Sequence, residues 1–160
     1  MPHVTIRPFE RRDQAAAKAL LLEGLAEHWG ALDPTLNPDL DDIAVSYAAG
    51  CFLTAWQEAS PSVGGSEGGA GERLVGTGAI LPETVDTARV ARMSVARDCR
   101  RQGIGRALLD ALCAAARDAG YRRLVLETTA AWRGVIDFYQ TYGFRALGVR
   151  EGDMHFEMDL

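Results

Sequence analysis

Three arginines and two glycines stand close together in residues 100–106, between a predicted strand and a predicted helix. Backbone N–H groups in the first turn of a helix have no partner within that helix, so they can point at an anion. Gly103 and Gly105 let the backbone come close to a ligand, and the arginines add positive charge. The segment therefore predicts a local phosphate-binding site.

Two well-known phosphate loops do not fit this segment. A P-loop requires Gly-Lys-Ser/Thr, which the segment lacks, and a dinucleotide-binding fingerprint requires a third Gly or Ala where this chain has Leu108. Dinucleotide oxidoreduction, which would show as stabilisation by NAD and not by CoA, therefore ranks third among the functional hypotheses.

The same residues resemble the GCN5-related N-acetyltransferase (GNAT) superfamily. In that family a motif of the form Arg/Gln-x-x-Gly-x-Gly/Ala binds the pyrophosphate of acetyl-CoA, and Arg100-Arg101-Gln102-Gly103-Ile104-Gly105 matches it at every defined position. Residues 92–95 are similar to the family's fourth strand. Residues 135–139 followed by Tyr142-Gly143-Phe144 are similar to its later helix and the strand after it. The resemblance spans about residues 74–160, with a weaker echo in residues 6–13.

The resemblance implies an α/β fold, a central mixed sheet of about six to seven strands with helices on both faces and a splay between the fourth and fifth strands. It implies acetyl-CoA (coenzyme A) as co-substrate and no metal. The pantetheine arm would pair with the fourth strand inside the splay, and a backbone amide near Val95 would serve as oxyanion donor. The implied cofactor-binding residues are Met93, Ser94, Val95, Arg100, Arg101, Gln102, Gly103, Ile104, Gly105, Arg106 and Trp132.

For catalysis, the resemblance implies that Tyr139 is the acid that protonates the departing thiolate. Many relatives carry a Glu as base in the first half of the fourth strand, where this chain has Arg89, and an Asn seven residues before the Tyr, where it has Trp132. Glu127 can replace the base directly or through water, and an amine that arrives partly deprotonated needs none. Without the resemblance, Tyr139 would be interpreted as a core aromatic of an amphipathic helix.

The acceptor is indicated only indirectly. Glu23 and Glu27 lie four residues apart on one face of the predicted first helix, beside His28 and Trp29. This pattern fits a substrate amine site and a solvated acidic edge ending in a packed Trp equally well. The acidic net charge and the glutamate pair together favour a cationic small molecule.

Composition excludes several partner classes. The 160 residues carry 17 Lys+Arg against 22 Asp+Glu, a net charge of −5, which disfavours nucleic acid as a partner. Three scattered histidines and three widely spaced cysteines give no metal-ligand spacing and no disulfide framework. No stretch approaches the length of a membrane span, so we expect a cytoplasmic protein in a reducing compartment.

Hydrophobic periodicity and turn residues predict the elements that position these groups. Strands are expected at 4–7, 51–56, 74–81, 90–95, 121–126, 144–149 and 154–160, and helices from Asp13 as cap to 29, from 37 to about 50, from 103 to 120 and at 132–142. Residues 60–71, rich in Ser and Gly, are expected to form a mobile hairpin loop within a single domain of residues 1–160. The order indicates a mixed sheet with helices on its faces.

Arg89 and Arg92 are expected to share a face of the fourth strand, a pattern that favours an acidic neighbour over the steering of an anionic substrate. The final strand, taken as an exposed edge, favours a homodimer, although the sequence leaves the oligomeric state open.

Two functional hypotheses follow from different classes. The first is an enzyme that transfers an acetyl group from acetyl-CoA to a primary amine of a small molecule or a peptide, by direct attack in a ternary complex. The alternative is a catalytically silent acetyl-CoA-binding sensor or interaction module, favoured by the missing Glu and Asn equivalents. Release of CoA in the presence of a panel of amines distinguishes the two.

Overall fold

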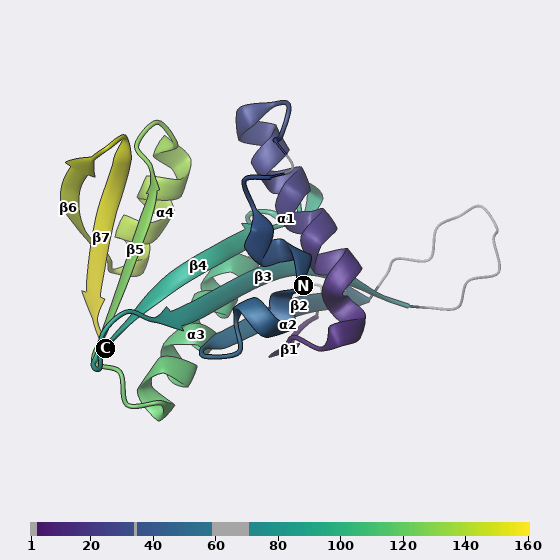
Figure 1. The fold of residues 1–160 in the computed structure, drawn as a ribbon, viewed down its shortest axis with the longest axis horizontal. Helices are drawn as coiled ribbons and strands as arrows, with labels where there is room; N and C mark the ends of the chain where they lie inside the picture. Colours follow the sequence, from purple (N-terminus) through teal and green to yellow (C-terminus); the bar gives the residue numbers. More distant parts are fainter. Residues whose placement is uncertain (1–2, 34, 59–70) are drawn as a thin grey trace.

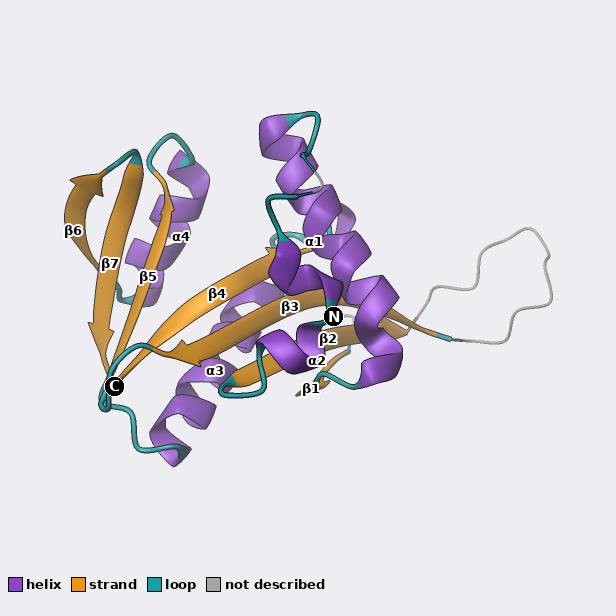
Figure 2. Cartoon of the chain, viewed as in Figure 1, coloured by secondary structure: helices purple, strands orange, loops and turns teal. Residues whose placement is uncertain are grey.

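A computed structural model describes residues 3–33, 35–58 and 71–160 of the chain. These residues form a seven-stranded mixed sheet in the order β1-β2-β3-β4-β5-β7-β6, with helices on both faces (Figure 1, Figure 2). The strands are β1 Val4–Pro8, β2 Cys51–Glu58, β3 Glu72–Pro82, β4 Thr87–Val95, β5 Arg123–Thr129, β6 Arg145–Arg150 and β7 Asp153–Asp159. The α-helices are α1 Gln14–Trp29, α2 Ile43–Ser46, α3 Ile104–Asp118 and α4 Arg133–Tyr142, and the short 3-10 helices are η1 Arg11–Asp13, η2 Pro38–Asp41 and η3 Arg97–Cys99. The expected fold class is confirmed.

Each face of the sheet carries its own hydrophobic core, because side chains alternate between the faces along each strand. Val75 of β3 packs with Leu108 and Leu112 of α3 on one face. Leu74, the neighbouring residue, packs with Leu21 of α1 and Ile43 of α2 on the other face. The two cores hold α1 and α3 on opposite sides of β3 and β4, so both helices can reach the end of β4.

The splay between β4 and β5 is confirmed. The two strands are parallel and pair only from Thr87 with Arg123 to Arg89 with Val125. Beyond these pairs β4 continues to Val95 and β5 to Thr129 without pairing with each other, and the two ribbons diverge (Figure 1). The wedge between them lies where the chain turns from β4 towards the start of α3.

A bulge in β4 sets which side chains face the wedge. Residues 92 and 93 stand opposite the single residue Gly78 of β3, and Arg92 adopts a positive φ of 54°. As a result Arg92 points to η2, where it bonds Asp39, while Met93 packs towards α3. A Cβ at position 78 would lie 2.6 Å from the Met93 sulfur, so a larger residue there would force the Met93 side chain to move. Arg89 and Arg92 both bond carboxylates, the arrangement that their spacing favoured.

The glycines predicted to delimit helices do so. Gly103 stands at the N-terminal cap of α3 with a φ of 81°, and Gly120 follows its C-terminus with a φ of 91°. Gly143 ends α4 with a φ of 131°, and the Phe144 N–H donates to the Tyr139 carbonyl at 3.0 Å, which completes a Schellman turn. The Phe144 side chain is buried, as the motif predicts.

Three structural predictions need correction. A single helix over residues 37–50 is wrong: η2 and α2 are separated at Asp42, which adopts extended angles and accepts a hydrogen bond from the Val45 N–H. Asp13 stands at the start of α1 but accepts from the Glu10 N–H at 2.9 Å, closing η1 instead. The final strand is not an edge, because β7 pairs with both β5 and β6.

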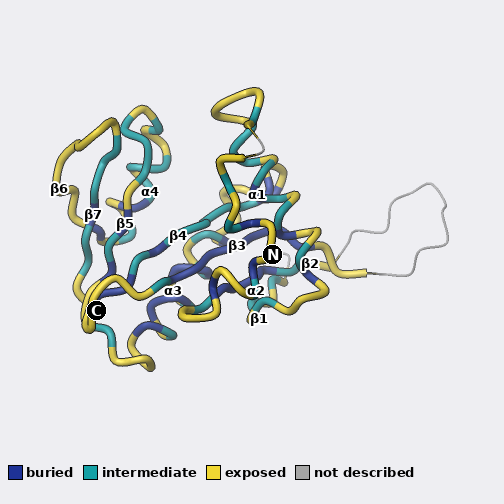
Figure 3. Tube along the Cα trace, viewed as in Figure 1, coloured by how far each residue is buried: buried dark blue, intermediate teal, exposed yellow. Residues whose placement is uncertain are grey.

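The free edge at that end of the sheet is β6, whose residues are all exposed (Figure 3). The prediction of a homodimer depends on an exposed edge at the final strand. Since β7 is not an edge, the homodimer stays an untested prediction. The loop expected at residues 60–71 lies, apart from Gly71, outside the described residues. Among the helices of the described ranges, none has the length and hydropathy required to cross a membrane.

Candidate active site

A cleft of about 950 Å³ follows the splay. Its walls come from the end of α1, from β4, from the start of α3, from β5 and from α4, with one residue of β7. Of the sequence-predicted residues, the cleft brings together Met93, Ser94, Val95, Arg100, Arg101, Gly103, Ile104, Gly105, Arg106, Trp132, Tyr139, Glu127 and His28. Gln102, Glu23, Glu27 and Trp29 do not line it. One continuous space thus joins the predicted phosphate site to Tyr139.

The start of α3 presents backbone donors to this cleft. The first hydrogen bond of the helix runs from the Ala107 N–H to the Gly103 carbonyl at 3.0 Å, so the N–H groups of residues 104–106 have no partner within the helix. A Cβ added to Gly103 would meet no atom within 4 Å, so the space beside this residue is open. Arg101 also has a positive φ, 63°, next to that glycine. The backbone here forms a cradle that fits an anion.

The arginines of the cradle are engaged differently. Arg100 forms a bidentate ion pair with Glu27 of α1, at 2.8 and 3.1 Å, and its Nε donates to the Val95 carbonyl. The Arg106 guanidinium lies 6.0 Å from the centroid of the Tyr142 ring. Arg101 is exposed to solvent. The three arginines therefore place positive charge around the cradle, and none of them makes a contact among the described residues that blocks its backbone N–H groups.

Tyr139 is enclosed by aromatic rings. Its ring centroid lies 5.2 Å from that of Phe138, 5.6 Å from Phe144 and 5.9 Å from Phe156, and only 6% of the residue is exposed. Burial raises the pKa of its phenol above the ordinary value of 10.0, so the hydroxyl stays protonated at neutral pH. No hydrogen bond joins that hydroxyl to any other described residue. It is a protonated donor on the wall of the cleft.

Glu127 pairs with the arginine that occupies the family's glutamate position. The Arg89 guanidinium contacts the Glu127 carboxylate and also binds Glu83 through two hydrogen bonds of 2.8 Å. Hydrogen bonding from Arg89 lowers the pKa of Glu83. Because β4 and β5 stop pairing at Arg89, this ion pair closes the narrow end of the splay.

Arg92 is held on the α1 side of the same strand. It donates to both carboxylate oxygens of Asp39, at 2.6 and 2.9 Å, and the Tyr47 hydroxyl donates to Asp39 at 2.6 Å. Burial opposes ionisation of Asp39, but hydrogen bonds from Arg92 and Tyr47 outweigh it and lower the Asp39 pKa. Burial and the bond to Asp39 raise the pKa of Tyr47 to about 12. The Asp39 carboxylate therefore neutralises the positive charge of Arg92.

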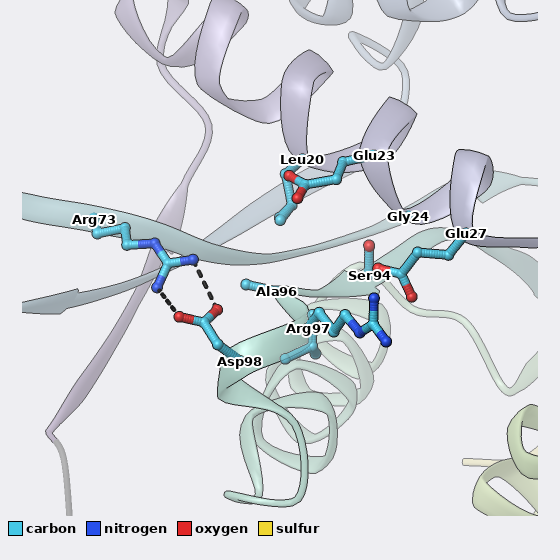
Figure 4. A pocket seen from close by; sticks show the side chains of 10 residues that line it. Leu20, Glu23, Gly24, Glu27, Arg73, Ser94, Ala96, Arg97 and Asp98 are labelled. Atoms are coloured by element: carbon cyan, nitrogen blue, oxygen red, sulfur yellow. Dashed lines mark hydrogen bonds and ion pairs between the residues drawn. The ribbon is translucent and has the colours of Figure 1, made fainter. Parts of the chain in front are cut away.

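The four residues predicted for the acceptor do not gather at one site. Glu23 and Glu27 line a second cavity, of about 560 Å³, between α1 and residues 94–98 (Figure 4). This cavity lies at the cradle end of β4, and Gly24, Ser94 and Val95 line both it and the main cleft. Arg73 and Asp98 form a bidentate ion pair on its far side, at 2.7 and 2.8 Å (Figure 4). Trp29 is 58% exposed and lines neither cavity.

His28 reaches the main cleft from α1. Its ring stacks on the Trp132 indole, with ring centroids 4.0 Å apart. The Trp29 ring also contacts that indole, with centroids 5.6 Å apart.

The sequence alone predicts no metal site. The described residues contain no group of three or more His, Cys, Asp or Glu side chains placed to hold a metal ion.

Sequence reasoning missed Asp153, Thr128, Leu21 and Leu25, all of which line the cleft. Asp153 enters it because β7 pairs with β5, and the sequence gives no signal of that pairing. Leu21 also belongs to the core between α1 and the sheet, so its apolar character in the sequence indicates packing and gives no sign of the cleft.

The comparisons with known proteins agree with this geometry. A family model described as the acetyltransferase (GNAT) family matches residues 22–144. The chain therefore belongs to the GNAT family of acetyltransferases.

Particular relatives are similar over most of the chain. Human N-acetyltransferase 8B is 34% identical over 122 residues, which cover 73% of this chain and 49% of that protein. Rat N-acetyltransferase 8F1 is 34% identical over 140 residues, which cover 82% of this chain and 58% of that protein. The chain thus spans about half the length of these curated relatives.

Solved structures share the fold. A GNAT-family acetyltransferase from Staphylococcus aureus Mu50 superposes with a TM-score of 0.82 at 18% identity, and each chain is covered over 99% of its length. PaiA N-acetyltransferase from Thermoplasma acidophilum, crystallised in complex with coenzyme A, superposes with a TM-score of 0.78 at 15% identity, also over 99% of each chain.

Proposed function

We propose that this chain transfers an acetyl group from acetyl-CoA to a primary amine. The observation that carries the proposal is the cleft that joins the cradle at the start of α3 to Tyr139. Family membership supports it, as do the coenzyme A complex of the Thermoplasma protein and the N-acetyltransferase names of the curated relatives.

The residues of the cleft fit a coenzyme with a diphosphate and an amide-bearing arm. The free N–H groups of residues 104–106 and the open space beside Gly103 suit a diphosphate, with Arg100, Arg101 and Arg106 adding charge. The stretch of β4 at Met93, Ser94 and Val95 has no partner on its β5 side, which suits strand-like pairing with the arm. Trp132 at the start of α4 stands beside that stretch as an apolar wall.

Acetyl-CoA supplies an activated acetyl group as a thioester. The amine nitrogen forms the new bond to the acetyl carbon while the bond from that carbon to sulfur breaks. Tyr139 donates its hydroxyl proton to the sulfur, and its raised pKa keeps that proton on the phenol at neutral pH until the thiolate departs. Glu127 receives the proton of the amine, directly or through water, unless the amine arrives already deprotonated.

The test is release of free CoA from acetyl-CoA by the purified chain with a panel of polyamines, amino acids, aminoglycosides and peptide N-termini. Turnover with at least one amine supports the proposal. Acetyl-CoA binding without turnover by any of them would contradict it and support the silent sensor. Stabilisation by NAD but not by CoA would contradict both.

A further inference from the structure

The charged residues that line the main cleft are separated by sign. Arg100, Arg101 and Arg106 stand at the start of α3, whereas Glu127 and Asp153 stand on the wall that β5 and β7 form side by side (Figure 1). Positive charge therefore faces the predicted position of the diphosphate, and negative charge faces the other part of the cleft. The acceptor has to enter this second part, since the cradle end is taken by the coenzyme.

The arginines near the acidic wall are not available to an anionic acceptor. Arg92 lines the cleft but donates to both oxygens of Asp39. Arg89, behind Glu127, is shared between two carboxylates, so this group of three charges is net negative by one. A carboxylate-bearing acceptor would have to break one of these ion pairs to be bound.

Glu127 and Asp153 lie on the same face of the sheet. The register pairs Glu127 with His155 and Thr129 with Asp153, which makes the two acids diagonal neighbours. Residues in that relation are about 7–8 Å apart. Within the described ranges Asp153 makes no ion pair, although the sheet register places it opposite Arg150 of β6. The Glu127 carboxylate, which also contacts Arg89, and the Asp153 carboxylate are thus two separate acidic groups on this wall.

A second observation concerns the Tyr139 hydroxyl, which belongs to a residue lining the same cleft. Tyr139 is more than nine-tenths buried and lines the cleft, yet its hydroxyl bonds to no other described residue. The hydroxyl oxygen is not among the fully buried unpartnered side-chain atoms of the described residues, so it is accessible from the cleft and can hydrogen-bond to a bound molecule. Glu127, Asp153 and Tyr139 all line the same cleft, so a ligand that spans the splay can contact the acids and the hydroxyl.

We infer that the acceptor carries two cationic nitrogens, of which one is acetylated beside Glu127 and Tyr139 while Asp153 binds the other. The inference rests on the proposed function and names the substrate class of the same site. The separation of the two acids selects a short, flexible diamine over a monoamine, and the paired arginines select against an amine with a carboxylate.

Three acceptors with the same four-carbon chain test this directly: 1,4-diaminobutane, butylamine and 4-aminobutyrate. A charge-assisted hydrogen bond is strong enough to favour the diamine over butylamine by about tenfold in kcat/KM. We expect 4-aminobutyrate to be the poorest of the three. Equal kcat/KM for all three, or preference for 4-aminobutyrate, would overturn the inference and leave the proposed function standing.

Variants identify the residue responsible. Asp153→Asn should lower the ratio of diamine to butylamine kcat/KM by about tenfold, and Asp153→Glu should keep most of it. Glu151→Gln removes the same charge two residues away in the exposed turn before β7, so it should leave the ratio unchanged. An unchanged ratio in Asp153→Asn would overturn the role of Asp153. Coenzyme binding with no turnover of any amine would instead overturn the proposed function, and this inference with it.

Discussion

His28 at the end of α1 stacks on Trp132 at the start of α4, with ring centroids 4.0 Å apart and planes inclined by 22°. The neighbouring Glu27 forms a bidentate ion pair with Arg100 at the start of α3. Consecutive residues of α1 thus bind both walls of the cleft, because α1 ends directly over the splay. The last turn of α1 is a bridge across the proposed coenzyme site.

Truncating the aromatic part of this bridge should destabilise the chain and loosen the coenzyme. An aromatic pair of this kind contributes about 0.5–1.5 kcal/mol, which corresponds to about 2–4 °C in Tm per kcal/mol for a chain of this size. We expect Trp132→Ala to lower Tm and to speed dissociation of CoA. Thermal unfolding of Trp132→Ala, His28→Ala and the double variant measures the coupling, and strict additivity would show that the two rings do not stabilise each other.

The ion pair between Glu27 and Arg100 should compete with the coenzyme. A diphosphate at the cradle attracts the Arg100 guanidinium, which Glu27 already binds at 2.8 Å. Because partly exposed pairs contribute at most about 1 kcal/mol, Glu27→Gln should tighten acetyl-CoA binding by roughly two- to fivefold. Glu23→Gln, one helical turn earlier, is the matched control and should change affinity little. Calorimetric titration measures both, and weaker binding by Glu27→Gln would contradict this competition.

Gly105 should tolerate substitution less than Arg106. Gly105→Asp adds a negative charge beside the cradle and a Cβ that would lie 3.2 Å from the Phe138 ring, so we expect loss of CoA binding in a folded protein. Gly105→Ala adds the Cβ alone and separates the steric effect from the charge. Arg106→Gln should weaken binding only a few-fold, since its guanidinium is exposed. Normal acetyl-CoA affinity of Gly105→Asp, with folding verified by circular dichroism, would show that the site lies elsewhere.

Tyr139→Phe separates catalysis from packing. The change keeps the ring among its aromatic neighbours and removes the proton donor, so kcat should fall by about 10²- to 10⁴-fold while acetyl-CoA affinity changes little. The loss should shrink for acyl donors whose thiol has a low pKa. A kcat within about twofold of the parent, when chemistry limits turnover, would return Tyr139 to a purely structural role.

The raised pKa of Tyr139 also predicts the pH dependence. Burial favours the neutral phenol, so the proton is present at low and neutral pH and is lost only above the ordinary tyrosine value. We therefore expect kcat of the parent to show no decline from this group below about pH 10. A basic limb near neutral pH that disappears in Tyr139→Phe would contradict the assignment.

Local chemistry in the sequence is enough to predict the cradle and most elements. The sequence places a strand, a glycine turn and an apolar helix in direct succession. This succession leaves unpartnered N–H groups at the start of α3 independently of the tertiary structure, because the atoms involved are close in sequence. The same holds for Gly143, which ends α4 through bonds to residues three and four positions earlier. The helix predicted over residues 37–50 failed because Asp42 bonds its own local backbone and interrupts it.

Only the tertiary structure decided what surrounds Tyr139. The pairing of Arg89 with Glu127 depends on the β4–β5 register, and the entry of Asp153 depends on β7 lying beside β5. The bulge at Arg92 determines that its charge meets Asp39 and not a substrate. A one-residue shift in any of these registers would move each side chain to the opposite face of the sheet, and periodicity within a strand carries no information about its register with another.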